Sequence, residues 1–186
     1  MPKFVADSVE TTGLKWVAPA GGGGYTFLSR TTFSNVATQD FTDVFSSTYD
    51  AYVLVIEDFS TATANNAFLL QFRTSGGVQN TGYYGTTTSL IFNGSAFTFT
   101  QTNNASALTL FAKSGTNAYP GSGVVNFFQV GTDNVYPVCF GQYQDAESGS
   151  LHSGFGYRAN NTYTGFRLSS TTNISGTVIL LGVNKS

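Results

Sequence analysis

Short apolar runs alternate with clusters of turn-forming residues from residue 25 to the end of the chain, and this pattern does most to limit the fold. Glycine and asparagine in these clusters tolerate positive φ, and proline presets φ at about −65°, so each cluster has a steric reason to turn the chain. Runs at this spacing are typical of an all-β sandwich or barrel. The predicted strands cover residues 25–32, 51–59, 67–73, 89–92, 96–101, 107–112, 123–130, 135–142, 152–158, 164–168 and 176–183.

The strongest local signal is Asn93-Gly94, which lies between the apolar segments 90–92 and 97–99. This dipeptide fits a type I′ turn, whose twist matches that of the strands it joins, so we predict a hairpin here. Residues 97–100 alternate Phe and Thr, which places both rings on one face of a strand and both hydroxyls on the other. One face of this hairpin should therefore be buried and the other wet.

Two runs, 53–56 and 178–181, are apolar at every position. Strands of this kind are either covered on both faces or in contact with another subunit. Two packed antiparallel sheets satisfy all of these patterns with the fewest assumptions. We therefore predict an all-β fold, a jelly-roll-like antiparallel β-sandwich, over residues 25–186.

The composition excludes the other fold classes. Gly, Ser, Thr and Asn supply 80 of the 186 residues, whereas Asp, Glu, Lys and Arg supply 18. Long soluble helices need Ala, Leu, Glu, Lys and Arg on their exposed faces, and Ser, Thr and Asn are poor helix formers. Disorder is excluded as well, because 41% of the residues are hydrophobic and 17 of them are phenylalanine.

The number and distribution of charged residues limit the classes of partner that the chain can bind. Eight basic and ten acidic residues give a net charge of −2 without any run of like charge, so we expect no nucleic-acid partner, which would need clustered Lys and Arg. No apolar stretch approaches the roughly 18 residues that a membrane span requires, and we expect no membrane insertion. A surface wetted mostly by hydroxyls and amides suits packing into assemblies or contact with sugars.

Residues 1–24 are predicted to form an extended N-terminal arm that precedes the sandwich domain. The run 21–24 is four glycines, which remove nearly all local backbone preference and mark a joint. One interpretation is a tail that folds back on its own domain. The other is an arm that docks on a neighbouring subunit, with Trp16 as a desolvated anchor. The predicted assembly residues of this arm are Leu14, Trp16, Val17 and Pro19.

Catalytic chemistry has little support in the sequence. His152 is the only histidine, and no G-x-S-x-G elbow is present. Asp145 and Glu147 stand two residues apart and would share a face of an extended strand, as the paired carboxylates of glycosidases do. The simpler interpretation is that both lie in a hydrated loop. Cys139 is the only cysteine, and its apolar flanks predict a buried, inert thiol. We therefore expect no enzyme activity, no metal site and no cofactor.

Tyrosines beside Asn, Gln, Gly and Thr are the remaining functional candidates, because such mixtures stack on sugar rings and hydrogen-bond to their hydroxyls. This mixed tyrosine set is Tyr83, Tyr84, Tyr136, Tyr143, Tyr157 and Tyr163. Half or more of these rings should belong to the core or to a subunit interface. We predict a glycan site on loop tips near Tyr83, Tyr143 or Tyr163.

Several segments resemble proteins of tailed-bacteriophage particles. The segments 6–8, 11–16 and 18–23 (ADS, TTGLKW and APAGGG) resemble a linker that recurs in tail-fibre and other virion proteins. Residues 45–55 (FSSTYDAYVLV) resemble the opening of the β-rich domain that often follows this linker, and residues 163–166 and 176–178 are similar to its closing strands. The resemblance is strongest over residues 6–73.

This resemblance implies a virion structural protein: a tail-fibre, tail-tip or adaptor subunit that is made in the bacterial host cytoplasm. It implies a homotrimer, other virion proteins as partners, and a host cell-surface glycan as a further ligand. Because the linker starts close to Met1, a compact adaptor, tip or decoration subunit fits better than a long fibre. The alternatives are a capsid decoration protein without a receptor role, and a polysaccharide depolymerase that would need Asp145 or Glu147. The family supplies no catalytic residues to carry over.

Overall fold

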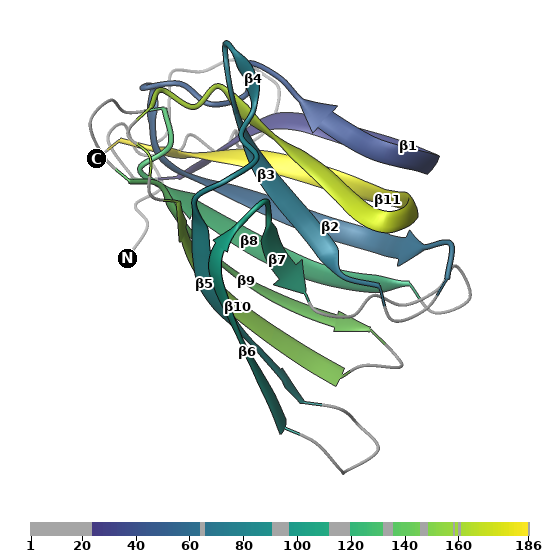
Figure 1. The fold of residues 1–186 in the computed structure, drawn as a ribbon. Coiled ribbons are helices and arrows are strands. Elements are labelled where there is room, and N and C mark those ends of the chain that lie inside the picture. The colour runs from purple at the N-terminus through teal and green to yellow at the C-terminus, as the bar shows by residue number, and fades with distance from the viewer. Residues whose placement is uncertain are drawn as a thin grey trace, which may run out of the picture.

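The computed structural model describes residues 24–63, 66–90, 97–111, 120–131, 136–145, 149–157, 159 and 161–185 (Figure 1). Strands dominate these residues, and none of them is helical. No helix in this part of the chain could therefore cross a membrane. The strands are β1 (Tyr25–Phe41), β2 (Tyr49–Thr61), β3 (Phe68–Thr74), β4 (Gly77–Val78), β5 (Tyr83–Leu90), β6 (Phe97–Ala105), β7 (Leu108–Phe111), β8 (Gly121–Phe128), β9 (Val138–Asp145), β10 (Gly149–Tyr157) and β11 (Gly165–Asn184).

All of these strands belong to one curled antiparallel sheet, whose main path is β4-β3-β11-β2-β8-β9-β10-β5-β6. The long strand β11 makes the curl possible: residues 165–169 pair with β3, and residues 174–184 pair with β2. Strand β1 runs beside both parts of β11, and β7 pairs with β3. As Figure 1 shows, β3, β4 and β7 lie over the fan of strands that runs from β1 to β6, so the sheet folds into a large and a small layer.

The core fills the space between these two layers with aromatic rings. Phe68 of β3 stacks on Phe59 of β2 with ring centroids 3.8 Å apart, and Phe111 of β7 stacks on Tyr143 of β9 at 4.5 Å. All four rings are buried. Burial of such large apolar side chains is the main favourable term in folding, so the contacts between layers hold the fold together.

The prediction of an antiparallel all-β sandwich is confirmed, with one topological difference. The predicted strands 164–168 and 176–183 are a single strand, β11, and the segment around Asn173 is not a turn. Instead, the Asn173 Nδ2 donates to the backbone O and to Oδ1 of Asn35, at 3.2 and 3.1 Å. Asn35 lies at an irregularity of β1, where the register with β11 shifts. The side chain of Asn173 therefore supports a bend within a continuous strand.

The predicted antiparallel pairing of β5 and β6 is confirmed, with Leu90 opposite Phe97. The predicted burial of one face is wrong at Phe99, which is 62% exposed on this edge strand. A turn centred on residues 93 and 94 would continue this register, although the turn itself is outside the described residues. Strand β5 begins at Tyr83, six residues before the predicted start at residue 89. Its core-facing positions include Gly85 and Thr87, and the Thr87 hydroxyl donates to the Thr109 carbonyl at 3.1 Å. A search for apolar runs cannot find a strand of this kind.

Candidate functional site

The outer face of the large layer carries the candidate functional surfaces. Directly paired residues of antiparallel strands share one face, so the register defines rows that cross the sheet. Two such rows cross seven strands in the order β1, β11, β2, β8, β9, β10 and β5. The first row is Tyr25, Val183, Ala51, Phe128, Val138, Gly156 and Tyr84, and the second is Phe27, Leu181, Val53, Asn126, Phe140, Gly154 and Thr86.

The β1 end of these rows is strongly apolar. We call the residues Tyr25, Phe27, Leu181, Val183, Ala51, Val53 and Phe128 the apolar strip. Tyr25 and Phe27 are 67% and 63% exposed, and Phe128 is exposed as well. Ala51 and Val53 on β2 are 8% and 9% exposed, and Leu181 and Val183 are partly buried, so the exposed part of the strip is Tyr25, Phe27 and Phe128. The strands of the strip were predicted to be covered on both faces or to contact another subunit. The core-facing side chains of the same runs, such as Leu54 and Leu180, are fully buried.

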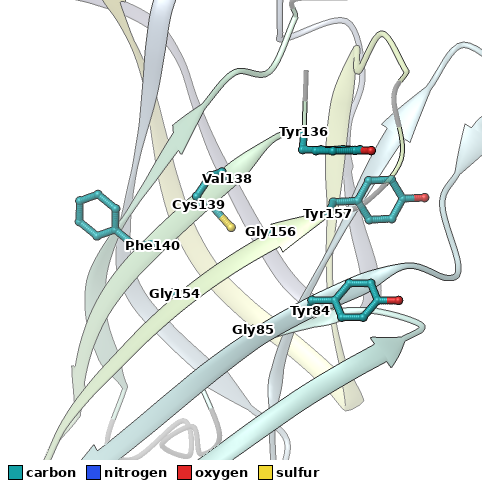
Figure 2. Close-up of a pocket in the computed structure, with 9 residues that line it drawn as sticks. All are labelled: Tyr84, Gly85, Tyr136, Val138, Cys139, Phe140, Gly154, Gly156 and Tyr157. Atoms are coloured by element: carbon teal, nitrogen blue, oxygen red, sulfur yellow. The ribbon is translucent and has the colours of Figure 1, made fainter. Parts of the chain in front are cut away.

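The other end of the rows holds an open groove of about 760 Å³ above β10 (Figure 2). β9 with Val138 and Phe140 borders one side of the groove and β5 with Tyr84 borders the other, and in Figure 2 the Phe140 ring points away from the tyrosine rings. Tyr136, in the segment before β9, borders one end and is 57% exposed. In Figure 2 the rings of Tyr84 and Tyr136 extend to the same side of the view, whereas Tyr157 is buried and its ring belongs to the core. The lining residues are Tyr84, Gly85, Tyr136, Val138, Cys139, Phe140, Gly154, Gly156 and Tyr157.

The floor of the groove is the backbone of two alternate glycines, Gly154 and Gly156. A Cβ added to either glycine would meet no atom within 4 Å, and neither has a positive φ. Glycine in a strand interior is unfavourable by roughly 0.5–1 kcal/mol relative to alanine. Neither packing nor backbone conformation therefore explains these glycines, whereas their missing side chains leave the groove open.

The three tyrosines predicted to bind glycan lie in the core and not on exposed loop tips. Tyr83, Tyr143 and Tyr163 are all buried, so their ring faces are not available for stacking on a sugar. Their hydroxyls are used for internal hydrogen bonds, as buried tyrosines require. The Tyr83 hydroxyl donates to Gln79 O at 3.0 Å and accepts from Phe72 N at 2.7 Å. The Tyr143 and Tyr163 hydroxyls donate to the carbonyls of Phe59 and Ala159.

Burial also removes acid–base chemistry from these groups. Loss of hydration raises the pKa of the Tyr83 and Tyr163 phenols above the ordinary value for tyrosine. For the same reason, burial raises the pKa of the Cys139 thiol to about 12. The predicted burial of Cys139 is thus confirmed, and its thiol belongs to the core cluster although its strand borders the groove.

A cluster of three charged side chains joins β1, β3 and β11. Asp40 of β1 pairs with Arg167 of β11 at 2.6 Å and with Arg73 of β3 at 2.9 Å. The hydrogen bond from Arg167 is the main cause that lowers the pKa of Asp40, with further attraction from both guanidinium groups. This cluster ties β1 to β11 and β3, so its role is structural. Among the residues that the structure describes, no group of three His, Cys, Asp or Glu side chains could hold a metal ion.

Several predicted residues lie outside the described part of the chain. The proposed assembly arm, with Leu14, Trp16, Val17 and Pro19, precedes residue 24, and Glu147 falls in a gap between β9 and β10. The side chains of Asp145 and His152 are not described either. The groove residues were partly missed: Tyr84 and Tyr136 belonged to the mixed tyrosine set, but the glycines did not. The sequence signal that could have indicated the groove is glycine at the alternate positions 154 and 156 of the predicted strand 152–158.

Comparison of the chain with models of known protein families, with curated proteins and with solved structures finds no match. The function must therefore be inferred from the geometry of the outer face and from the sequence itself.

Proposed function

We propose that this chain is a non-catalytic structural subunit of a tailed-bacteriophage particle. In this proposal it associates with copies of itself through the apolar strip and attaches to other virion proteins through residues 1–24. The apolar strip carries the proposal. The resemblance of residues 6–73 to the linker and domain of phage fibre proteins supplies the kind of particle, and a trimer is the assembly that this resemblance implies.

Exposure of the apolar strip to water is unfavourable in free energy. Burial of one large apolar side chain contributes roughly 1.5–3 kcal/mol, and Tyr25 and Phe27 are each about two-thirds exposed. Contiguous apolar patches on soluble domains mark sites of interaction. Exposed charges border the strip: Asp50 precedes Ala51, Lys185 follows Val183 by two residues, and Arg30 pairs with Glu57 at 2.9 Å. Contact between two copies would therefore bury the exposed rings at the centre and leave these charges at the rim.

The position of Gly24 connects the strip with the N-terminal segment. Asn184 N donates to Gly24 O at 3.0 Å, so the chain enters β1 at a fixed point beside Tyr25 and Val183. Trp16 precedes Gly24 by eight residues, and eight extended residues span at most about 28 Å. The proposed anchor can thus reach any part of the strip or the adjacent surface of a neighbouring copy.

Sedimentation of the full chain over a range of concentrations tests self-association. We expect a mass that is a multiple of the single chain, and a decrease in association of at least tenfold in Phe27→Ser. Phe99→Ser is the matched control, because Phe99 on the distant edge strand β6 is 62% exposed but lies outside the strip. A wild-type chain that sediments as a single copy at every concentration, or equal effects of both substitutions, would overturn self-association through the strip.

Deletion of residues 1–20 tests the attachment. We expect the truncated chain to fold but to be lost from assembled particles, and images of the intact particle should locate the wild-type subunit. Unchanged incorporation of the truncated chain would remove the role of the arm, and failure to find the wild-type subunit in particles would overturn the virion assignment.

A further inference from the structure

The groove above β10 is a second surface that self-association through the strip does not use. We propose that this groove binds a neutral saccharide, with Tyr84 and Tyr136 as stacking rings and with the backbone at Gly154 and Gly156 as the floor. This inference does not rest on the assembly proposal, because it is carried by other residues and a different geometry.

The shape of the groove is suited to a flat ligand. Its volume of about 760 Å³ falls within the range of roughly 300–1,000 Å³ that small-ligand sites occupy. Phe140 lies opposite Gly154 in the register, and Gly154 lies opposite Thr86. A Cβ at Gly154 or Gly156 would project into the groove and would meet no atom within 4 Å. The two glycines therefore determine whether a ligand can reach the sheet backbone.

The chemistry of the lining selects an uncharged ligand with both apolar and polar sides. None of the nine lining residues carries a charge at neutral pH, which disfavours phosphates, nucleic acids and acidic sugars. Tyrosine presents an apolar ring with a polar tip. A pyranose ring matches this combination, because its C–H face stacks on an aromatic ring while its hydroxyls hydrogen-bond at the edge. The phenol groups of Tyr84 and Tyr136 point to the same side, so one sugar chain could contact both (Figure 2).

The groove is separated from the apolar strip by a pair of stacked rings. Phe128 of β8 and Phe140 of β9 have ring centroids 5.8 Å apart and nearly parallel planes. Phe128 belongs to the strip and Phe140 lines the β9 side of the groove. A neighbouring copy seated on the strip would approach this ridge from the β1 side, whereas the groove opens on the β5 side. Assembly and sugar binding can thus occur on one sheet face at the same time.

The test uses the labelled full-length chain on an array of neutral and acidic oligosaccharides, followed by calorimetric titration with the strongest neutral ligand. We expect binding to neutral glycans, and a decrease in affinity of at least tenfold in Gly156→Val, whose Cβ meets no atom within 4 Å and whose methyl groups enter the groove. Tyr136→Ala, which removes an exposed ring, should weaken binding by a similar factor. Ser122→Val is the matched control, since Ser122 is an exposed strand position on β8 that does not line the groove. Its affinity should stay within twofold of wild type.

The outcomes separate this inference from the assembly proposal. Retention of acidic glycans alone, absence of any neutral ligand, or full binding by Gly156→Val would each overturn the saccharide site. Thermal melting by circular dichroism shows whether each variant is folded, and a folded Gly156→Val that still binds is decisive. Phe27→Ser provides the cross-check: it should lose self-association and keep sugar affinity at the level of the single chain. Loss of both properties in Phe27→Ser would place the ligand on the strip and contradict the groove.

Discussion

Strands β8 and β9 have two faces that use the same kinds of residue for opposite purposes. Phe127 and Phe128 are neighbours in sequence, yet the first is fully buried and the second is exposed on the outer face. Phe127 packs against Phe45 and Phe166, each at a centroid distance of 5.3 Å, whereas the ring on which Phe128 stacks is the exposed Phe140. The comparison teaches that aromatic content alone does not mark a core. Successive side chains of a strand point to opposite faces of the sheet, and the face decides whether a ring packs in the core or is exposed to a partner.

Glycines of the inner and outer faces also differ in how closely other atoms surround them. A Cβ on Gly121 of β8 would lie 2.0 Å from the Tyr143 Oη, so the inner face requires glycine there. A Cβ on Gly154 would meet nothing within 4 Å. The inner glycine thus makes room for a core ring, whereas packing does not require the outer glycine.

The largest expected difference in unfolding free energy is the one between alanine substitutions at Phe127 and at Phe128. Phe127→Ala should lower the free energy of unfolding by about 3–5 kcal/mol, because it leaves a cavity among well-packed rings. Phe128→Ala should cost less, about 1–2 kcal/mol, since its ring is 38% exposed and leaves no enclosed cavity when it is removed. Urea unfolding monitored by fluorescence at low protein concentration measures both values. Equal losses would contradict the division into an inner and an outer face.

A smaller effect is expected from adding a methyl group on the inner face. Gly121→Ala forces the buried Tyr143 ring and its hydroxyl to move, and overpacking of this kind costs typically about 1–3 kcal/mol. Thermal unfolding should show a lower midpoint. A midpoint at or above that of wild type would mean that β8 and β9 can separate without loss, and the assigned packing of Tyr143 would be wrong.

Removal of one phenol oxygen should distinguish the buried tyrosines from those of the groove. Tyr83→Phe leaves the Phe72 N–H without its acceptor in the core, so we expect a loss of about 1–3 kcal/mol in unfolding free energy. Tyr136→Phe should leave stability unchanged, because Tyr136 is 57% exposed. Chemical denaturation of the two variants side by side provides the measurement. A stable Tyr83→Phe would return Tyr83 to the list of possible ligand contacts.

Tyr83 and Tyr84 also show how far the sequence could predict this site. Apolar periodicity located most strands because runs such as 53–56 carry a strong signal. Strand β5 carries none: its inner positions Gly85 and Thr87 are no more apolar than its outer positions Thr86 and Thr88. Since a shift of one residue exchanges the two faces of a strand, the sequence could not say which of the two adjacent tyrosines faces outward.

The groove was harder to predict than the core for a related reason. It is made by residues of β5, β9 and β10 and the segment before β9, and only the strand order brings them together. A glycine pair in a sequence with 21 glycines is ambiguous, because a turn, a bulge or a close contact explains most glycines. Only the distances around each Cβ position separate the glycines that packing requires from those that it does not.

The charged cluster gives a smaller, pH-dependent effect on the edge of the small layer. The pKa of Asp40 is lowered in the folded chain, so the cluster contributes stability above the ordinary pKa of aspartate, about 3.9, and loses it as the pH falls through the lowered value. Water screens this half-exposed group, and we expect less than about 1 kcal/mol. Stability measured from pH 6 to pH 2 should fall less steeply in Asp40→Asn. Arg30→Ser, which breaks the exposed pair with Glu57, is the control and should leave the profile unchanged.

The smallest expected effect has the opposite sign and addresses the outer glycines directly. Gly154→Ala should raise the free energy of unfolding by about 0.5 kcal/mol, because alanine restricts the unfolded chain and fits the open space without strain. Denaturation of this variant beside Gly121→Ala compares an outer with an inner glycine. A clear loss of stability in Gly154→Ala would mean that the backbone conformation of β10 requires glycine at this position. The open floor of the groove would then follow from the strand conformation and would be no evidence for a ligand. A gain would mean that glycine at this position is kept against the stability of the fold, as a site that must admit a flat ligand requires.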